Sequence, residues 1–119
     1  MIISAVSQLL KLNPNFKPAF DGLKIANDLV LKLKTHVVIN EAFLFGSASE
    51  GKNTIDSDID LLIIVNDQDS ITKAYHEVNQ PFFSEIAVDW IIKTQTEFDE
   101  QKEIGGVCFI ASKSGKRIL

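Results

Sequence analysis

The stretch SDIDLLIIV, residues 57–65, decides the fold. Its second half is apolar without interruption, which is typical of a strand covered on both faces. Two aspartates, Asp58 and Asp60, precede that half at positions i and i+2. Side chains two residues apart on a strand project from the same face, so both carboxylates should lie together. The stretch therefore predicts a buried strand with paired acids where it begins.

The rest of the chain predicts helices that flank a small mixed sheet. Thr94 is followed by Glu97 at the spacing of a capping box, which marks the start of the last predicted helix. A short apolar run over 107–111 is expected to be a fourth strand or a docked tail. The fold class is α/β or α+β, in a single domain over residues 1–119. Helices are expected over 2–12, about 18–34, about 70–79 and 94–104, and strands over 37–45, 59–65 and 84–92.

Composition excludes several classes of protein. The 119 residues suffice for one hydrophobic core, and the formal net charge of −4 argues against a general nucleic-acid binder. A single cysteine, Cys108, excludes an internal disulfide framework and a cysteine-rich zinc site. No apolar run approaches the roughly 20 residues that span a bilayer, and residues 1–12 lack the pattern of a secretory signal. A cytoplasmic protein is expected.

Two further features accompany the aspartate pair. Gly46-Ser47 directly follows a predicted strand, where backbone amides and a hydroxyl can reach an anion; the alternative is a plain turn. Asp89 lies inside a predicted strand, where aspartate is unfavourable. Asp58 alone could be a solvated loop carboxylate or a cap. Three carboxylates at one edge of a sheet would repel one another unless a divalent cation neutralised them, and oxygen ligands suit Mg²⁺.

The spacing of these residues resembles a known signature. Gly46-Ser47, ten intervening residues and Asp58-Ile59-Asp60 resemble the motif of the polymerase-β-like nucleotidyltransferase superfamily. Asp89, in the run Val-Asp-Trp, is similar to the later strand aspartate of the minimal nucleotidyltransferases (MNT). That small branch includes antitoxin partners of helical HEPN toxins, the MNT/HEPN type.

The resemblance implies a role for each matching residue. Asp58 and Asp60 would hold two Mg²⁺ ions, and Asp89 would be the third metal-binding and catalytic carboxylate, acting as or orienting the base. Gly46 and Ser47 would bind the β- and γ-phosphates of ATP or another nucleoside triphosphate. Lys52 and Ser57 are further candidate nucleotide-binding residues. Two metal ions at such a site can activate the incoming oxygen and stabilise the leaving pyrophosphate.

One position departs from the pattern. Many family members carry an arginine before the second glycine of the loop, where this chain has Glu50. A carboxylate there removes a candidate triphosphate ligand and adds repulsion. Lys52 could partly substitute, as could Lys113, Lys116 or Arg117 if the tail folds back; the alternative is a solvated terminus.

Three functions are consistent with these expectations. The first is Mg²⁺-dependent transfer of AMP from ATP to a hydroxyl, which in the antitoxin branch is typically a tyrosine of the helical HEPN partner. The second is a catalytically weak binding module that neutralises such a partner by occlusion. The third is transfer to a small-molecule acceptor. Neither membrane association nor strong nucleic-acid binding is expected, and the oligomeric state stays open.

Overall fold

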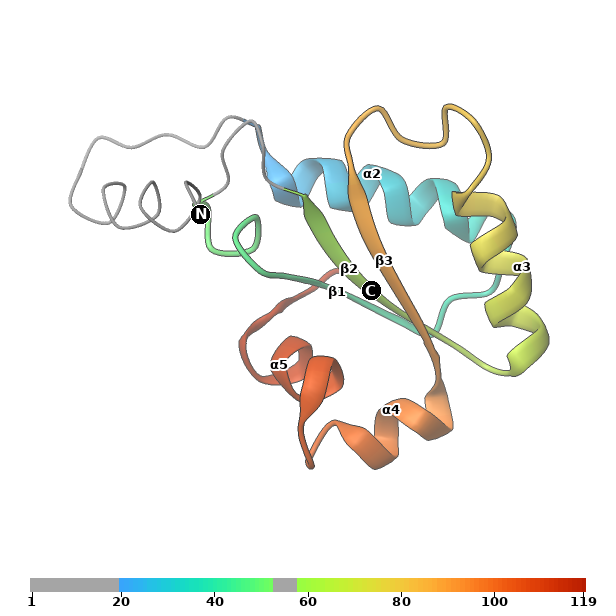
Figure 1. Cartoon of the computed structure of the whole chain (residues 1–119), viewed down its shortest axis with the longest axis vertical. Helices are drawn as coiled ribbons and strands as arrows, with labels where there is room; N and C mark the ends of the chain where they lie inside the picture. Colours follow the sequence, from blue (N-terminus) through green and yellow to red (C-terminus); the bar gives the residue numbers. More distant parts are fainter. Residues whose placement is uncertain (1–19, 53–57) are drawn as a thin grey trace.

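The computed structural model describes residues 20–52 and 58–119, so the predicted helix over 2–12 and Ser57 lie outside the described residues. It has a four-stranded mixed sheet with strand order β3-β2-β1-β4 and helices on both faces (Figure 1). This confirms the predicted α+β class with a small mixed sheet. The elements are α2 (Gly22–Lys34), β1 (Glu41–Phe45), β2 (Ile59–Val65), α3 (Gln68–Val78), β3 (Val88–Thr94), α4 (Gln95–Gln101), α5 (Gly106–Ser114) and β4 (Lys116–Arg117).

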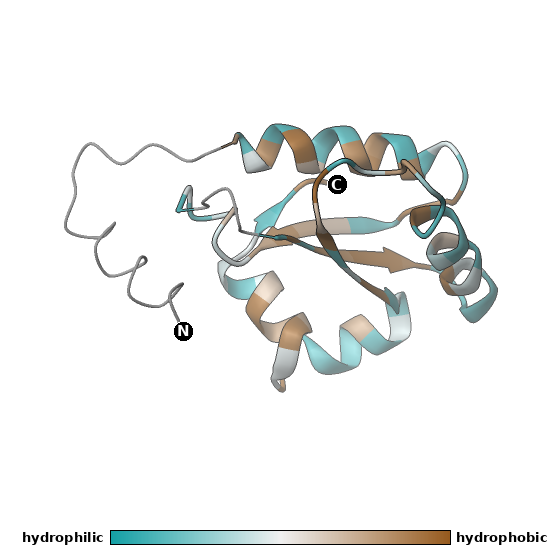
Figure 2. Ribbon diagram, turned by 45° about the horizontal axis from the view of Figure 1, so that its top comes forward, coloured by the Kyte–Doolittle hydropathy of each residue, from teal (hydrophilic) through white to brown (hydrophobic). Residues whose placement is uncertain are grey.

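Strand β2 forms the centre of the sheet. It pairs antiparallel with β1 and parallel with β3, and all its residues except Asp60 are buried. This explains its continuous apolar sequence, because side chains from both faces enter a core. In Figure 2 the strands are largely apolar, whereas the outer faces of the helices carry much of the polar surface.

The two faces of the sheet have separate cores. Helices α2 and α3 cover one face, where Leu44, Leu61 and Ile63 pack with helix residues such as Val30 and Leu33. Helices α4 and α5 cover the other face. The sequence did not predict which face each helix covers. There the packed residues are Phe43, Leu62, Ile64, Phe98, Cys108 and Ala111. Each fully buried large apolar side chain contributes about 1.5–3 kcal/mol to folding, so both cores support the central strand.

Side chains define where three helices begin. The Asp21 carboxylate accepts a hydrogen bond from the Lys24 amide at the start of α2, and Asp67 accepts one from the Ser70 amide at the start of α3. The predicted capping box of α4 is confirmed, with Thr94 and Glu97 bonded reciprocally. Such caps satisfy amides that have no partner within the helix.

Several predicted boundaries were wrong for local reasons. The first strand begins at Glu41 instead of residue 37, because the amides of His36 and Val37 still bond to Leu33 and prolong the turn after α2. The third strand begins at Val88 instead of residue 84. The Ser84 hydroxyl donates to the Ile86 carbonyl and accepts from its amide, which bends the chain before the strand.

The helices predicted over about 18–34 and 94–104 are shorter than expected. The first begins at Gly22, where Asp21 caps it, and α4 ends at Gln101. After Gln101 the chain forms a turn in which the amides of Ile104 and Gly105 both donate to the Gln101 carbonyl.

The apolar run over 107–111 is part of helix α5, so the expected fourth strand or docked tail at that place was wrong. Cys108 and Ala111 are both buried and stand three residues apart, which is the spacing of one helix face. The fourth strand comes later, where β4 pairs antiparallel with β1. Among the described residues, no helix has the length and apolarity needed to cross a membrane.

Candidate active site

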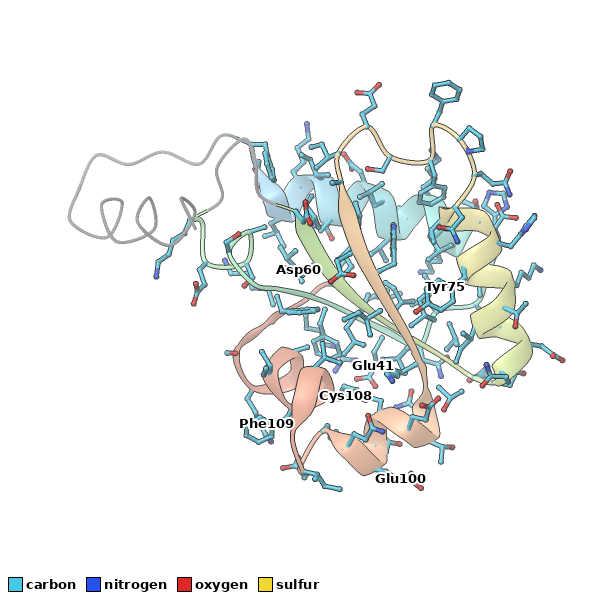
Figure 3. The ribbon with its side chains drawn as sticks, in the orientation of Figure 1. Glu41, Asp60, Tyr75, Glu100, Cys108 and Phe109 are labelled. Atoms are coloured by element: carbon cyan, nitrogen blue, oxygen red, sulfur yellow. The ribbon has the colours of Figure 1, made fainter. Side chains whose placement is uncertain are left out.

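Sheet pairing brings two of the three predicted aspartates together. Asp60 is the second residue of β2 and Asp89 the second residue of β3, and the two are direct partners in the parallel pair. Partners in register project from the same face, here the face of α4 and α5. Neither helix covers this end, since Asp89 is exposed and Asp60 only half-buried (Figure 3). Asp58, also exposed, precedes Asp60 by two residues.

The three carboxylates act on one another electrostatically. Burial raises the pKa of Asp60, and the negative charges of Asp89 and then Asp58 raise it further. Both causes disfavour the ionised form of Asp60. A divalent cation placed among the three groups would reverse the balance, because it attracts all three charges.

The donor set fits Mg²⁺ chemically, since all three groups offer carboxylate oxygens. Within residues 20–52 and 58–119, no three acidic, histidine or cysteine side chains are already gathered closely enough to hold a metal ion. Binding would therefore require side-chain rotation. Asp58 and Asp89 are exposed and can make that movement.

The turn after β1 is built around Gly46. Its φ of 75° is in the left-handed region, and a Cβ there would collide with the Asp60 carboxylate. Glycine is therefore required on both conformational and steric grounds. The Ser49 hydroxyl donates to the Gly46 carbonyl at 2.7 Å, which closes the turn.

The backbone amides of this turn divide into two groups. Those of residues 49–52 donate to carbonyls within the turn, whereas no hydrogen bond among the described residues uses the amides of Ser47 and Ala48. Unused amides in such a turn can bind an anion. The phosphate contact at Gly46-Ser47 stays a prediction, for which the Ser47 amide is one candidate donor.

A pocket of about 360 Å³ lies between this turn and helix α5. Its volume is within the range of small-molecule sites. The Lys52 ammonium lies 3.8 Å from the Glu50 carboxylate, and both side chains are largely exposed. Glu50 is thus part of the turn after β1 and partly offsets the charge of Lys52. The pocket is lined by Gly46, Ser47, Ser49, Glu50, Lys52, Ile110 and Ser114.

The cations of the C-terminal tail do not line this pocket in the described structure. The tail does fold back, because β4 pairs with β1. However, Lys113 pairs with Glu103 at 2.9 Å and Arg117 with Glu41 at 3.3 Å. Lys116 lines a different cavity, together with the first residues of α2. Of the lysines considered as substitutes for the missing arginine, Lys52 is the one at the pocket.

Two lining residues, Ile110 and Ser114, were not found from the sequence. Both are on α5, the helix that was expected to be a strand or tail. Helical spacing offered a signal, since residues 110 and 114 are one turn apart and share a face. That signal depends on recognising the helix first.

Comparisons with known proteins found a family and a solved structure to which this chain is similar. Residues 27–114 match the family described as "Polymerase beta, Nucleotidyltransferase". The chain is also similar to the crystal structure of a candidate nucleotidyltransferase from Sulfolobus solfataricus. The identity is 24%, the match covers 66% of this chain and 71% of that one, and the TM-score is 0.46. None of the curated proteins matches the chain.

Proposed function

Because the chain belongs to the polymerase beta nucleotidyltransferase family, we propose that it transfers AMP from ATP to a hydroxyl acceptor in a Mg²⁺-dependent reaction. The observation that carries the proposal is the register of Asp60 with Asp89. Asp60 lies beside Gly46 at the start of a turn. No hydrogen bond among the described residues uses the Ser47 and Ala48 amides of that turn. Acidic side chains and an anion-binding turn are the two parts that transfer of a phosphate ester requires.

Each residue has a defined task in the proposed reaction. Ser47 would hold the terminal phosphates, and the α-phosphorus would then lie toward the aspartates. The acceptor oxygen forms a bond to the α-phosphorus while the bond to the bridging oxygen breaks, and pyrophosphate leaves with the electron pair. Asp89, an exposed carboxylate on β3, takes the proton of the acceptor hydroxyl. Two Mg²⁺ ions held by Asp58, Asp60 and Asp89 would supply charge neutralisation for this in-line displacement.

We propose further that the acceptor is a tyrosine of a small helical protein of the HEPN type. The support is the resemblance of the motif to the minimal nucleotidyltransferases. A tyrosine hydroxyl is a chemically suitable acceptor, because its pKa of about 10 makes it easier to deprotonate than an aliphatic alcohol.

Glu50 favours a second candidate function, in which the protein binds and occludes its partner with little catalysis. Its carboxylate lies at the pocket and partly neutralises Lys52. A triphosphate would be held less firmly there than in a pocket with an additional cation. In that case the aspartates would still bind a cation, but nucleotide transfer would be slow.

The experiment mixes the purified protein with Mg²⁺, ATP labelled at the α-phosphate and an extract of its own source. Transfer predicts a labelled macromolecule and released pyrophosphate, and Asp89→Asn should abolish both. ATP labelled at the γ-phosphate is the control, because that label must leave with pyrophosphate. A complex with a helical partner that carries no label from either nucleotide would favour the occlusion function.

A further inference from the structure

Helix α5 is held beside the phosphate-binding turn by close backbone packing. Its buried residues Cys108 and Ala111 pack on the sheet under Phe43 and Leu62, while Phe109 points away from the sheet (Figure 3). Immediately after the helix, a Cβ at Gly115 would lie 2.9 Å from the Leu44 carbonyl oxygen. Only glycine permits this approach to β1, the strand that leads into the turn. The position of α5 is therefore fixed relative to the turn.

The pocket between α5 and the turn has two different walls. The turn supplies the Ser47 hydroxyl and the ion pair of Glu50 with Lys52, whereas the Ser49 hydroxyl already donates to the Gly46 carbonyl. Helix α5 supplies Ile110, the apolar side chain among the described lining residues. Ser47 and Lys52 of the polar wall can bind phosphates against the repulsion of Glu50, whereas the apolar wall suits the face of a planar ring.

We propose that Ile110 binds the nucleoside part of the nucleotide, with the base or ribose packed against α5 while the phosphates occupy the turn. This proposal rests on the proposed function and adds a binding residue that lies outside the sequence motif. Ile110 is 52% exposed, so about half of its surface is available to a ligand. The Ser114 hydroxyl donates to the Ile110 carbonyl at 2.9 Å, which directs that hydroxyl toward the helix backbone.

Ile104 provides a matched control for Ile110. It is the same residue type, is 82% exposed and belongs to the turn between α4 and α5. It is not among the residues that line the pocket. A general effect of shortening an exposed isoleucine should therefore be the same at both positions.

The test measures two affinities by calorimetry in the presence of Mg²⁺, one for ATP and one for inorganic tripolyphosphate. We expect Ile110→Ala to weaken ATP binding about fivefold, from the lost apolar contact, and to leave tripolyphosphate binding within about twofold. Ile110→Trp should weaken ATP binding further by filling the pocket. Ile104→Ala and Ile104→Trp should change neither affinity, and melting curves verify that every variant is folded.

Two results would overturn the inference while leaving the proposed function intact. In one, Ile110→Ala and Ile104→Ala bind ATP equally well. In the other, Ile110→Ala weakens tripolyphosphate as much as ATP, which would mean that α5 acts on the phosphate site. If the unmodified protein bound neither ATP nor tripolyphosphate, the proposed function itself would fail, and the inference with it.

Discussion

Replacing Asp60 with asparagine should stabilise the folded protein when no divalent cation is present, while abolishing nucleotidyl transfer. The reason is the register of Asp60 with Asp89, which holds two like charges side by side. Neighbouring strands of a sheet lie roughly 5 Å apart, so the Cβ atoms of partners in register are separated by about that distance. Two unit charges at about that separation repel by about 1 kcal/mol when water screens them well, and by more when it does not. Because Asp89 is exposed, we expect the lower value.

The pH dependence has the same origin. The folded state raises the pKa of Asp60, through burial first and the charges of Asp89 and Asp58 next. An acid whose pKa is raised by folding lowers stability once it ionises, so stability falls as the pH rises through that raised pKa. The advantage of asparagine should therefore be present at neutral pH and should disappear in acid, where Asp60 is protonated.

The assay is thermal unfolding with EDTA and with excess Mg²⁺. A gain of about 1 kcal/mol should raise the Tm by roughly 3–5 °C in a domain of this size. Mg²⁺ should stabilise the unmodified protein, because a ligand that binds only the folded state shifts the equilibrium toward it. It should stabilise Asp60→Asn little or not at all. Asp28→Asn, an exposed change on α2, is the control and should alter neither result.

A lower Tm for Asp60→Asn would contradict this reasoning. If Asp60→Asn lowered the Tm in EDTA and Mg²⁺ stabilised both proteins equally, Asp60 would be a structural residue. The cation site, and with it the proposed catalytic role of the three aspartates, would then be refuted.

Three further predictions concern the turn and one helix. Gly46→Ala should lower the free energy of unfolding by about 1–3 kcal/mol and remove activity. The reason is that residue 46 has a left-handed φ and that the alanine Cβ would displace the Asp60 carboxylate. Chemical denaturation and a transfer assay test this. Glu50→Arg should tighten ATP binding by about 1 kcal/mol, roughly fivefold in Kd at low salt, whereas the exposed Glu100→Arg on α4 should not. Asp67 caps α3, and the hydrogen bond from the Ser70 amide lowers the pKa of its carboxyl. The ionised Asp67 therefore stabilises the folded protein at neutral pH, and this stabilisation is lost as the pH falls through that lowered pKa. Acid melts of Asp67→Asn should lack this loss, since an asparagine cap does not titrate.

Local sequence patterns predicted the parts of the fold that depend on near neighbours. The apolar run of β2 and the reciprocal bonds of Thr94 with Glu97 were both found where expected. Trp90 directly follows Asp89 in β3, so it faces the other side of the sheet, where it packs against the core of α2 and α3. Alternation along a strand determines such a result whatever the tertiary contacts are.

Helix α5 was not predictable in the same way. Its apolar run from Val107 to Ala111 has five residues, a length at which helix and strand patterns are hard to separate. The preceding Gly105-Gly106 marks a break but does not determine whether a helix or a strand comes after it. Packing under the sheet decides the outcome, because a helix buries Cys108 and Ala111 on one side. The missed helix also concealed the contribution of Ile110 to the pocket.

The strand directions explain why the candidate site lies at one end of the sheet. Strands β2 and β3 are parallel, so both begin at the same end of the sheet. Each carries its aspartate as the second residue. Strand β1 is antiparallel to β2 and therefore finishes at the same end of the sheet, where Gly46 begins the turn. A shift of β3 by one residue would turn Asp89 toward α2 and α3, away from Asp60. The site thus depends on one register, which the pairing of β3 with the buried strand β2 holds and which no local motif could fix alone.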